Sequence, residues 1–164
     1  MKCDVKMASF SKDRVYRYAL WRSWYPVTVT LNNYVNFIML NPSTADESTD
    51  DATIRKCIKF AKSWGYYGLI VTNLFAYRST DRKVLRQVAD PIGPENDSHI
   101  LWAAREASRV IAAWSQDGDL FARSAWTRSM LTRPLHYLRM GKKGEPYHPL
   151  YLPDNSQPIL WEGR

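Results

Sequence analysis

The chain has 164 residues, 45% of them hydrophobic, which is the size of one domain with a single buried core. Its longest apolar runs, such as residues 110–114, fall far short of the roughly 18 residues that span a bilayer, and the N-terminus lacks a signal pattern, so we expect a cytoplasmic protein. The formal net charge of +7 favours an anionic partner, either nucleic acid or a nucleotide.

The sequence contains no repeat, no low-complexity segment and no Gly/Ser-rich linker, so we expect residues 1–164 to form one domain. Two cysteines are present, Cys3 near the start and Cys57 further on. They can pair in principle, but reduced cysteines fit a cytosolic protein better.

Residues 14–30 alternate aromatic and basic side chains and end in the β-branched run "VTVT", which predicts a strand or a hairpin. Arg17 is one of the basic residues in this segment. A mixture of cations and aromatic rings suits contact with phosphates and stacking on bases. The alternative is that the rings belong to the core and the cations to the solvated surface.

From residue 34 onward, short apolar strands alternate with helical patterns. The helical spacing of Ile54, Cys57, Ile58, Ala61 and Trp64 predicts one apolar face on a helix over 50–65. The remaining predicted elements are strands over 34–40, 68–74, 109–115 and 135–140, helices over 95–108 and 119–131, and a turn over 141–146. This alternation predicts a three-layer α/β/α fold with a central, mostly parallel sheet, preceded by the N-terminal strand or hairpin.

Polar residues follow three of these strands at the point where each strand ends. They are Asn41-Pro42-Ser43, Thr72-Asn73-Leu74 and Trp114-Ser115. Because ligands bind beyond the carboxyl ends of parallel strands, we expect these groups to converge on one edge of the sheet.

Five segments, taken in order, resemble one known protein family. They are "YRYALWRSW" (16–24), "FIMLNPSTADESTDDATIRKC" (37–57), "WGYYGLIVTNLFAYRSTD" (64–81), "DPIGPEND" (90–97) and "HPLYL" (148–152). On these segments the chain is identified as a member of the bacterial and phage family catalogued as domain of unknown function 1643. That family brings no established activity.

A more distant resemblance, to the uracil-DNA glycosylase superfamily, rests on "LNPS" (40–43), "VTNL" (71–74) and a late "HP" (148–149) in the same order. It implies a uracil-DNA glycosylase-like fold and an N-glycosylase activity. It also implies that Asn41 orients the attacking water, that Asn73 reads the edge of a flipped base, and that His148 stabilises the departing base. Leu40 and Leu150 replace the glycine and the serine of the superfamily motifs, so the resemblance does not specify uracil as the substrate.

Each of these residues also has an ordinary structural interpretation. Asn41-Pro42 can start a turn that Ser43 caps, Asn73 can simply end a strand, and His148 can be a loop histidine. Arg78 follows the Asn73 strand and is a candidate clamp for phosphate or substrate, or else a solvated loop arginine.

The acidic loop over 46–51 divides in two. Asp50 or Asp51 can cap the helix that begins near Ala52. Asp46 and Glu47 stand closer to Asn41, where a carboxylate can act as a general base or bind a hard metal ion. We take Asp46 as a catalytic candidate, with Pro42 and Ser43 shaping the pocket.

These patterns together favour an N-glycosylase-like enzyme that binds a flipped, and in some cases modified, base of DNA or of a nucleotide. A non-catalytic nucleic-acid-binding module and an interaction protein of phage-host conflict remain alternatives on the same fold. No zinc spacing, Walker loop or dinucleotide fingerprint is present, so we expect neither a bound metal nor a cofactor. The basic residues predicted to border the site and contact nucleic acid are Arg17, Arg133, Arg139, Lys142 and Lys143.

Overall fold

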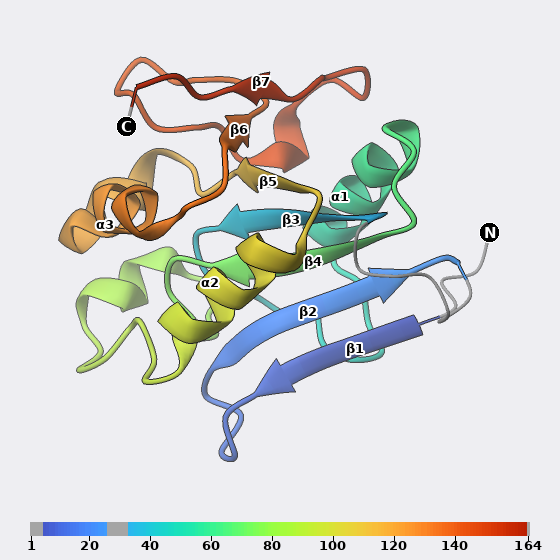
Figure 1. The fold of residues 1–164 in the computed structure, drawn as a ribbon. Helices are drawn as coiled ribbons and strands as arrows, with labels where there is room; N and C mark the ends of the chain where they lie inside the picture. The colour runs from blue at the N-terminus through green and yellow to red at the C-terminus, as the bar shows by residue number, and fades with distance from the viewer. Residues whose placement is uncertain (1–4, 26–32, 164) are drawn as a thin grey trace.

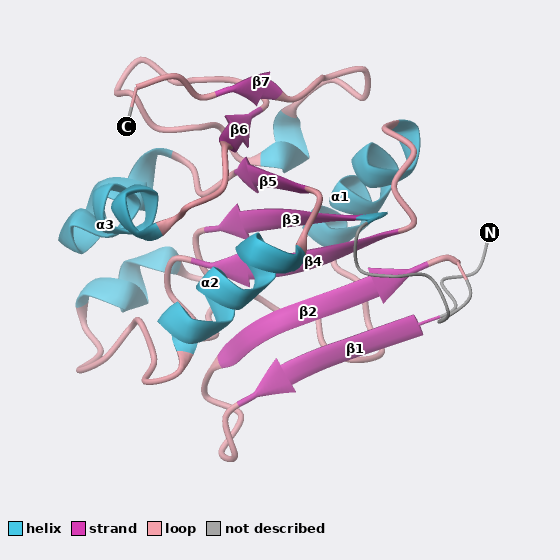
Figure 2. Cartoon of the chain, in the orientation of Figure 1, coloured by secondary structure: helices cyan, strands magenta, loops and turns pink. Residues whose placement is uncertain are grey.

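A seven-stranded mixed sheet organises the computed structural model, which describes residues 5–25 and 33–163 (Figures 1 and 2). The strands lie in the order β1-β2-β4-β3-β5-β6-β7. Their bounds are β1 Val5–Phe10, β2 Arg17–Ser23, β3 Tyr34–Met39, β4 Gly68–Asn73, β5 Arg109–Ala112, β6 Leu135–Tyr137 and β7 Ile159–Leu160.

The centre of the sheet is parallel and its edges are antiparallel. Strand β3 lies between β4 and β5 and is parallel to both, and β6 is parallel to β5. Strands β1, β2 and β7 run antiparallel to their neighbours. All six residues of β4 are buried, as expected for a strand covered on both faces. The predicted α/β fold and the N-terminal antiparallel pair are therefore confirmed, while residues 26–30 of the predicted hairpin segment lie outside the described residues.

Three α-helices cover the two faces of the sheet: α1 Ala52–Ser63, α2 Asn96–Glu106 and α3 Arg123–Met130. Helix α1 packs on one face, and α2 and α3 lie on the other (Figure 1). Short 3₁₀ helices connect the larger elements: η2 Arg82–Arg86, η3 Gln116–Ala122 and η4 Pro149–Tyr151. No helix in the described part of the chain is long and apolar enough to cross a membrane.

The helical spacing in the sequence identified the buried side of α1. Its buried residues are Ile54, Cys57, Phe60 and Ala61, and Cys57 is a buried free thiol; Cys3 lies outside the described residues. The helix predicted over 119–131 begins as an α-helix only at Arg123. Phe121 and Ala122 have φ angles of 53° and 56°, left-handed values that an α-helix cannot contain.

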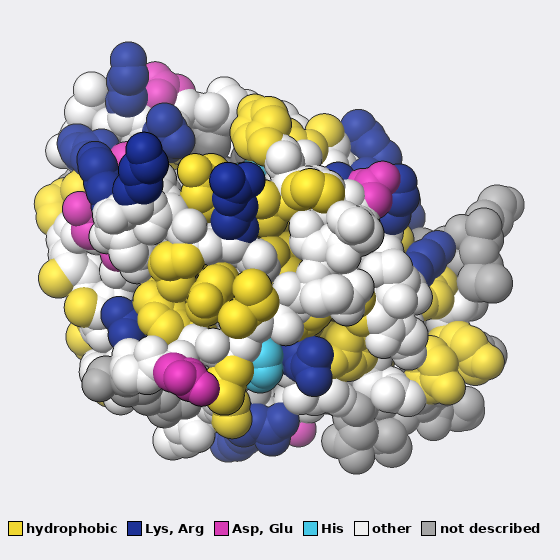
Figure 3. All heavy atoms as spheres, turned by 90° about the horizontal axis from the view of Figure 1, so that it is seen from above, with side chains coloured by type: hydrophobic (Ala, Val, Ile, Leu, Met, Phe, Trp, Pro, Cys, Tyr) yellow, Lys and Arg dark blue, Asp and Glu magenta, His cyan; other side chains and the backbone are white. Residues whose placement is uncertain are grey.

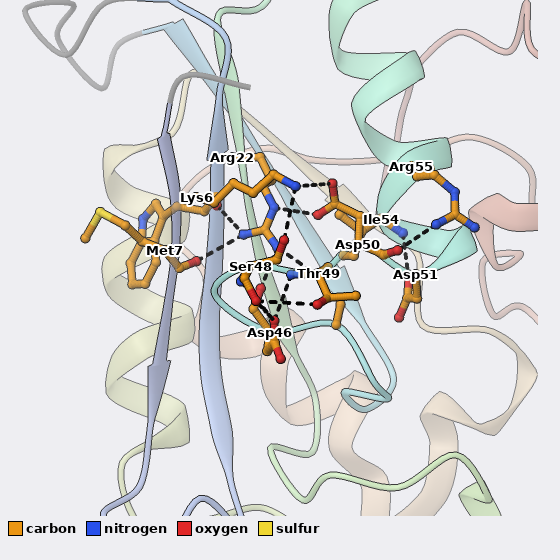
Figure 4. A network of polar contacts seen from close by, with 12 residues as sticks. Lys6, Met7, Arg22, Asp46, Ser48, Thr49, Asp50, Asp51, Ile54 and Arg55 are labelled. Carbon is orange, nitrogen blue, oxygen red and sulfur yellow. Dashed lines mark hydrogen bonds and ion pairs between the residues drawn. The ribbon is translucent and has the colours of Figure 1, made fainter. Parts of the chain in front are cut away.

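The acidic loop between β3 and α1 is attached to the sheet through one buried arginine (Figure 4). The side chain of Arg22, on β2, is 0% exposed, and its Nε donates to Asp50 Oδ1 at 2.6 Å. Its two Nη atoms donate to the backbone carbonyl groups of Met7, Trp21, Asp46 and Thr49. Lys6 Nζ forms a second ion pair with Asp50 at 3.1 Å. Every nitrogen of the guanidinium therefore has an acceptor, as a buried charge requires.

The other carboxylates of this loop also have structural partners. Asp46 Oδ1 accepts hydrogen bonds from the backbone N–H groups of Ser48 and Thr49, which lower the pKa of Asp46 to about 2. Asp51 caps α1 by accepting from the N–H of Ile54 at 2.9 Å. The run of acids after β3 thus builds a turn, an ion pair and a helix cap.

We predict that Asp50→Asn lowers the free energy of unfolding by about 2–4 kcal/mol, because it leaves the buried Arg22 cation without its carboxylate. Burial raises the pKa of Asp50, but the hydrogen bonds from Arg22 and Lys6 outweigh that effect, so its pKa lies below the usual value. The stabilisation is therefore complete above about pH 4 and is lost as the pH falls further. Urea unfolding at pH 7 and pH 3 measures both effects.

Glu47→Gln is the matched control for this prediction. Its partner Arg14 is about half exposed, and solvent screens such pairs, so we expect no measurable loss of stability. Equal losses in the two variants would show that Arg22 does not depend on Asp50.

Candidate active site

A cleft with a volume of about 530 Å³ opens at the carboxyl ends of β3 and β5. Its walls come from four segments: the end of β3 and the residues after it (Met39, Leu40, Asn41, Ser43), the start of α1 (Asp51, Thr53, Ile54), residues 79–82, and the late loop (His148, Leu150, Tyr151). Arg17 and Ser115 complete the lining. The structure thus brings Asn41, Ser43, His148 and Arg17, all predicted site residues, into one cleft.

The amide of Asn41 is held in a single orientation. Its Nδ2 donates to the carbonyl oxygen of Ser79 at 2.9 Å and to that of Pro42 at 3.2 Å. Because both acceptors are carbonyl oxygens, the nitrogen of the amide must face them. No described N–H or O–H group donates to Asn41 Oδ1, which leaves this oxygen as an acceptor for water or a ligand.

His148 lines the cleft as a neutral imidazole. Its Nδ1 accepts a hydrogen bond from the N–H of Leu150 at 3.2 Å, so the proton of the neutral ring lies on Nε2. Burial lowers the pKa of His148 below the ordinary value of 6.5, and the neighbouring charge of Asp51 opposes that shift only in part. At neutral pH the ring therefore offers one donor, Nε2–H.

Asn73 ends β4 and is not among the residues that line the cleft. It is 0% exposed, and neither its Nδ2 nor its Oδ1 has a hydrogen-bond partner. Its strand lies between β2, which carries Arg17, and β3, where Met39 is directly opposite Asn73. Arg17 and Met39 line the cleft, so Asn73 lies next to residues of the lining without being one of them.

A β-bulge in β2 directs Arg17 into the cleft. Phe10 pairs with Arg17 and Ser9 pairs with Ala19, which leaves Tyr18 as the extra residue. In a regular strand Arg17 and Leu20 point to opposite faces, but the bulge brings them to the same face, that of α1. Tyr18 instead stacks on His99 of α2.

Besides Asn73, the predicted site residues Asp46, Pro42 and Arg78 lie outside the cleft lining. Asp46 does not line the cleft, and its Oδ1 accepts the hydrogen bonds of the turn described above, so the geometry does not support the prediction of a general base there. The carbonyl oxygen of Pro42 accepts from Ser79 N–H and from Asn41 Nδ2, which joins two walls of the cleft. Arg78 stacks on the ring of Phe10 and donates to the carbonyl of Arg14.

The other predicted basic residues do not line the cleft either. Arg133 donates to the carbonyl groups of Ala107 and Ser108, just before the amino end of β5 and thus at the opposite edge of the sheet. Arg139 lies over the ring of Tyr147, and Lys142 and Lys143 occupy an exposed turn. On the face shown in Figure 3, Lys and Arg side chains form separate groups around hydrophobic side chains and not one continuous stripe.

Several cleft residues were not expected from the sequence. Residues 79–82 contribute Thr80 and Arg82, to which no sequence pattern assigned a role in the site. Asp51 was expected only as a helix cap, yet it also lines the cleft. Tyr151 lines the cleft with 83% of its surface exposed, two residues after Pro149 of the "HP" motif. Among the described residues, no three His, Cys, Asp or Glu side chains gather as a metal site requires.

Comparison with known proteins identifies a family but not an activity. The chain belongs to the family described as "Protein of unknown function (DUF1643)", whose model matches residues 17–150. The matched span begins at Arg17 and ends at Leu150, and so covers most of the cleft. No curated protein and no solved structure matches the chain.

Ser115 adopts a strained backbone conformation where it lines the cleft. Its φ of 70° and ψ of −177° fall in a region that is essentially restricted to glycine. We predict that Ser115→Gly is more stable than Ser115→Ala by about 1 kcal/mol, because glycine removes the strain and both variants lack the hydroxyl. Urea unfolding of the two variants measures the difference. An alanine variant as stable as the glycine variant would contradict strain at this position.

Proposed function

We propose that the protein is an N-glycosylase-like enzyme that binds a base of nucleic acid or of a nucleotide in the cleft and hydrolyses its bond to the sugar. The observation that carries the proposal is the buried, unpartnered amide of Asn73, which is paired with Met39 of the lining of a cleft that Asn41 and His148 also line. An amide offers a donor and an acceptor side by side, as the hydrogen-bonding edge of a base does. Leaving both atoms unpaired destabilises the free protein, and a bound base would satisfy them.

In this proposal Asn41 Oδ1 accepts a hydrogen bond from the attacking water and directs its lone pair at the sugar carbon. The carbon–nitrogen bond breaks, its electron pair stays on the base, and the hydroxyl of the water bonds to the sugar carbon. His148 Nε2–H donates to the base as negative charge develops on it, and the proton of the water neutralises the departing base. A donor aimed at developing charge in a buried site lowers the barrier more than it would in water.

One observation favours the alternative of a binding module without turnover. Asp51 is the carboxylate nearest the start of α1 in the cleft, and its Oδ1 is already occupied in capping the helix. With Asp46 held in its turn, the activation of water depends on Asn41 and on the second oxygen of Asp51. A binding module would use the same pocket and would release no base.

We predict that Asn41→Ala leaves nucleic-acid binding nearly unchanged and lowers the rate of base release by roughly two to three powers of ten, the scale for losing one positioned catalytic group. The assay uses oligonucleotides that carry uracil, mismatched thymine or modified pyrimidines, and scores abasic sites by alkaline cleavage. Asn155→Ala, at an exposed loop position, is the matched control and should retain full activity. Binding without abasic product across the panel would favour the binding module, and undiminished product from Asn41→Ala would place the chemistry elsewhere.

We predict that Asn73→Leu abolishes base binding while it leaves the free energy of unfolding unchanged or raises it by about 1 kcal/mol, because leucine replaces two unpaired polar atoms. Asn36→Leu is the matched control. Asn36 is equally buried, but its Nδ2 donates to the carbonyl of Ile70 and to Thr72 Oγ1, so this variant should lose stability. Urea unfolding and a base-binding titration test both variants, and a marked loss of stability in Asn73→Leu would assign Asn73 a structural role.

A further inference from the structure

Arg17 is a buried cation without a carboxylate partner. It is 1% exposed, its Nη1 donates to the carbonyl of Ala45 at 2.7 Å, and its Nε has no partner. Burial lowers its pKa to about 10, so it still carries its charge at neutral pH. Within the described part of the chain it forms no ion pair. An unpaired charge inside a protein is costly unless something else compensates it.

The two other buried arginines in the described part of the chain each form an ion pair with a carboxylate. Arg22 pairs with Asp50, and Arg123, which is 4% exposed, pairs with Asp97 at 2.6 Å. Arg17 differs from both because it lines the cleft, and the bulge at Tyr18 is what turns it there. The position of the unpaired cation is therefore built into the sheet.

Ser43, Thr53 and Thr80 line the same cleft as Arg17, and each carries a hydroxyl group. These hydroxyl groups form no hydrogen bond with any described residue. The backbone N–H of Thr53 lies in the first turn of α1, where helical N–H groups have no partner in the helix and the helix dipole is positive. This twelve-residue helix has no acidic residue in its first turn.

Each of the two carboxylates that line the cleft accepts a backbone hydrogen bond, and neither forms an ion pair with Arg17. Asp51 caps α1, and Asp81 accepts from the N–H of Lys83 at the start of η2. Arg82, a second cation of the cleft, pairs with Asp117 at 3.0 Å. Arg17 remains as the cation whose charge no described side chain neutralises by direct contact.

We propose that the Arg17 side of the cleft is a phosphate subsite, and that the ligand is therefore a nucleotide unit and not a free base or nucleoside. A phosphate supplies the negative charge that Arg17 lacks and enough oxygens to accept from the guanidinium, the three hydroxyls and the N–H of Thr53. A volume of about 530 Å³ accommodates more than a phosphate, which leaves room for the sugar and base toward His148. The identity of the ligand as a nucleotide rests on the proposed function.

The test compares phosphate-bearing and phosphate-free probes by isothermal titration calorimetry. Thymidine 5′-monophosphate should bind the intact protein roughly tenfold to a hundredfold more tightly than thymidine, the scale of a charge-assisted contact. Arg17→Met should erase that difference, whereas Arg86→Met, at an exposed arginine of η2, should retain it. The subsite would be overturned if Arg17→Met keeps the preference, or if the intact protein binds the two probes equally. The exception is a phosphate subsite that binds only the backbone of a nucleic acid, which the oligonucleotide arm of the test detects.

That arm separates a free nucleotide from the backbone of a nucleic acid. A short oligothymidylate without terminal phosphates should lose affinity in Arg17→Met if the subsite holds a phosphodiester. If thymidine 5′-monophosphate alone depends on Arg17, the subsite takes a free nucleotide. If neither probe depends on Arg17, there is no phosphate subsite.

Two further measurements keep the test decisive. Arg17→Met removes an unpaired charge, so this variant should fold with unchanged or higher stability. If it does not fold, the double variant Ser43→Ala/Thr80→Ala replaces it in the test and should reduce the preference for thymidine 5′-monophosphate over thymidine severalfold. An unchanged preference in the double variant would overturn the subsite. Base release distinguishes this proposal from the proposed function. If the protein prefers the phosphate-bearing probe but releases no base, the subsite is supported and the glycosylase activity is not. If Arg17→Met releases base at an undiminished rate and the protein shows no phosphate preference, the glycosylase activity is supported and the subsite is not.

Discussion

The burial of the Arg22 guanidinium is the constraint on which the candidate site depends. A fully buried cation must have acceptors for all its donors, and Arg22 finds them in Asp50 and in four backbone carbonyls. Two of those carbonyls, of Asp46 and Thr49, belong to the loop between β3 and α1. Satisfying Arg22 therefore fixes the path of that loop, and with it Ser43, the cap residue Asp51 and the start of α1.

The same face of the sheet contains a second buried arginine, Arg17, whose guanidinium group lacks a complete set of partners. Arg22 has a complete set of partners, while Arg17 has an unpartnered Nε and no carboxylate. The unpartnered amide of Asn73 lies on the strand beside it. Unsatisfied polar atoms lower stability, so each of them needs an explanation beyond folding. Arg17 lines the cleft, and the strained backbone of Ser115 lies at the same cleft.

Much of the fold follows from local patterns in the sequence. Continuous apolar runs identified β3, β4 and β5 because strands buried on both faces need no alternation, and the apolar spacing of α1 identified its buried side. The carboxyl-end rule also placed Asn41 and Ser115 correctly at one edge of the sheet. These features depend on neighbours within a few residues.

The remaining features depend on contacts between distant segments. The bulge at Tyr18 is defined by pairing with β1, and the contribution of residues 79–82 depends on hydrogen bonds to Asn41 and Pro42. Sequence proximity suggested Asp46 as a partner for Asn41, but its carboxylate instead accepts hydrogen bonds from the nearby N–H groups of Ser48 and Thr49. Arg133 lies at the other edge of the sheet because it binds carbonyls that precede β5. The number of basic residues in the sequence does not show at which edge of the sheet each of them lies.

The central claim is that the cleft holds a base between Asn41, Asn73 and His148. A crystal structure of the protein with a bound nucleotide or a short oligonucleotide tests it most directly. The account predicts that the edge of the base lies within hydrogen-bonding distance of the Asn73 amide and of His148 Nε2, with a water on Asn41 Oδ1. A base bound elsewhere, with the Asn73 amide still unpartnered, would contradict the account.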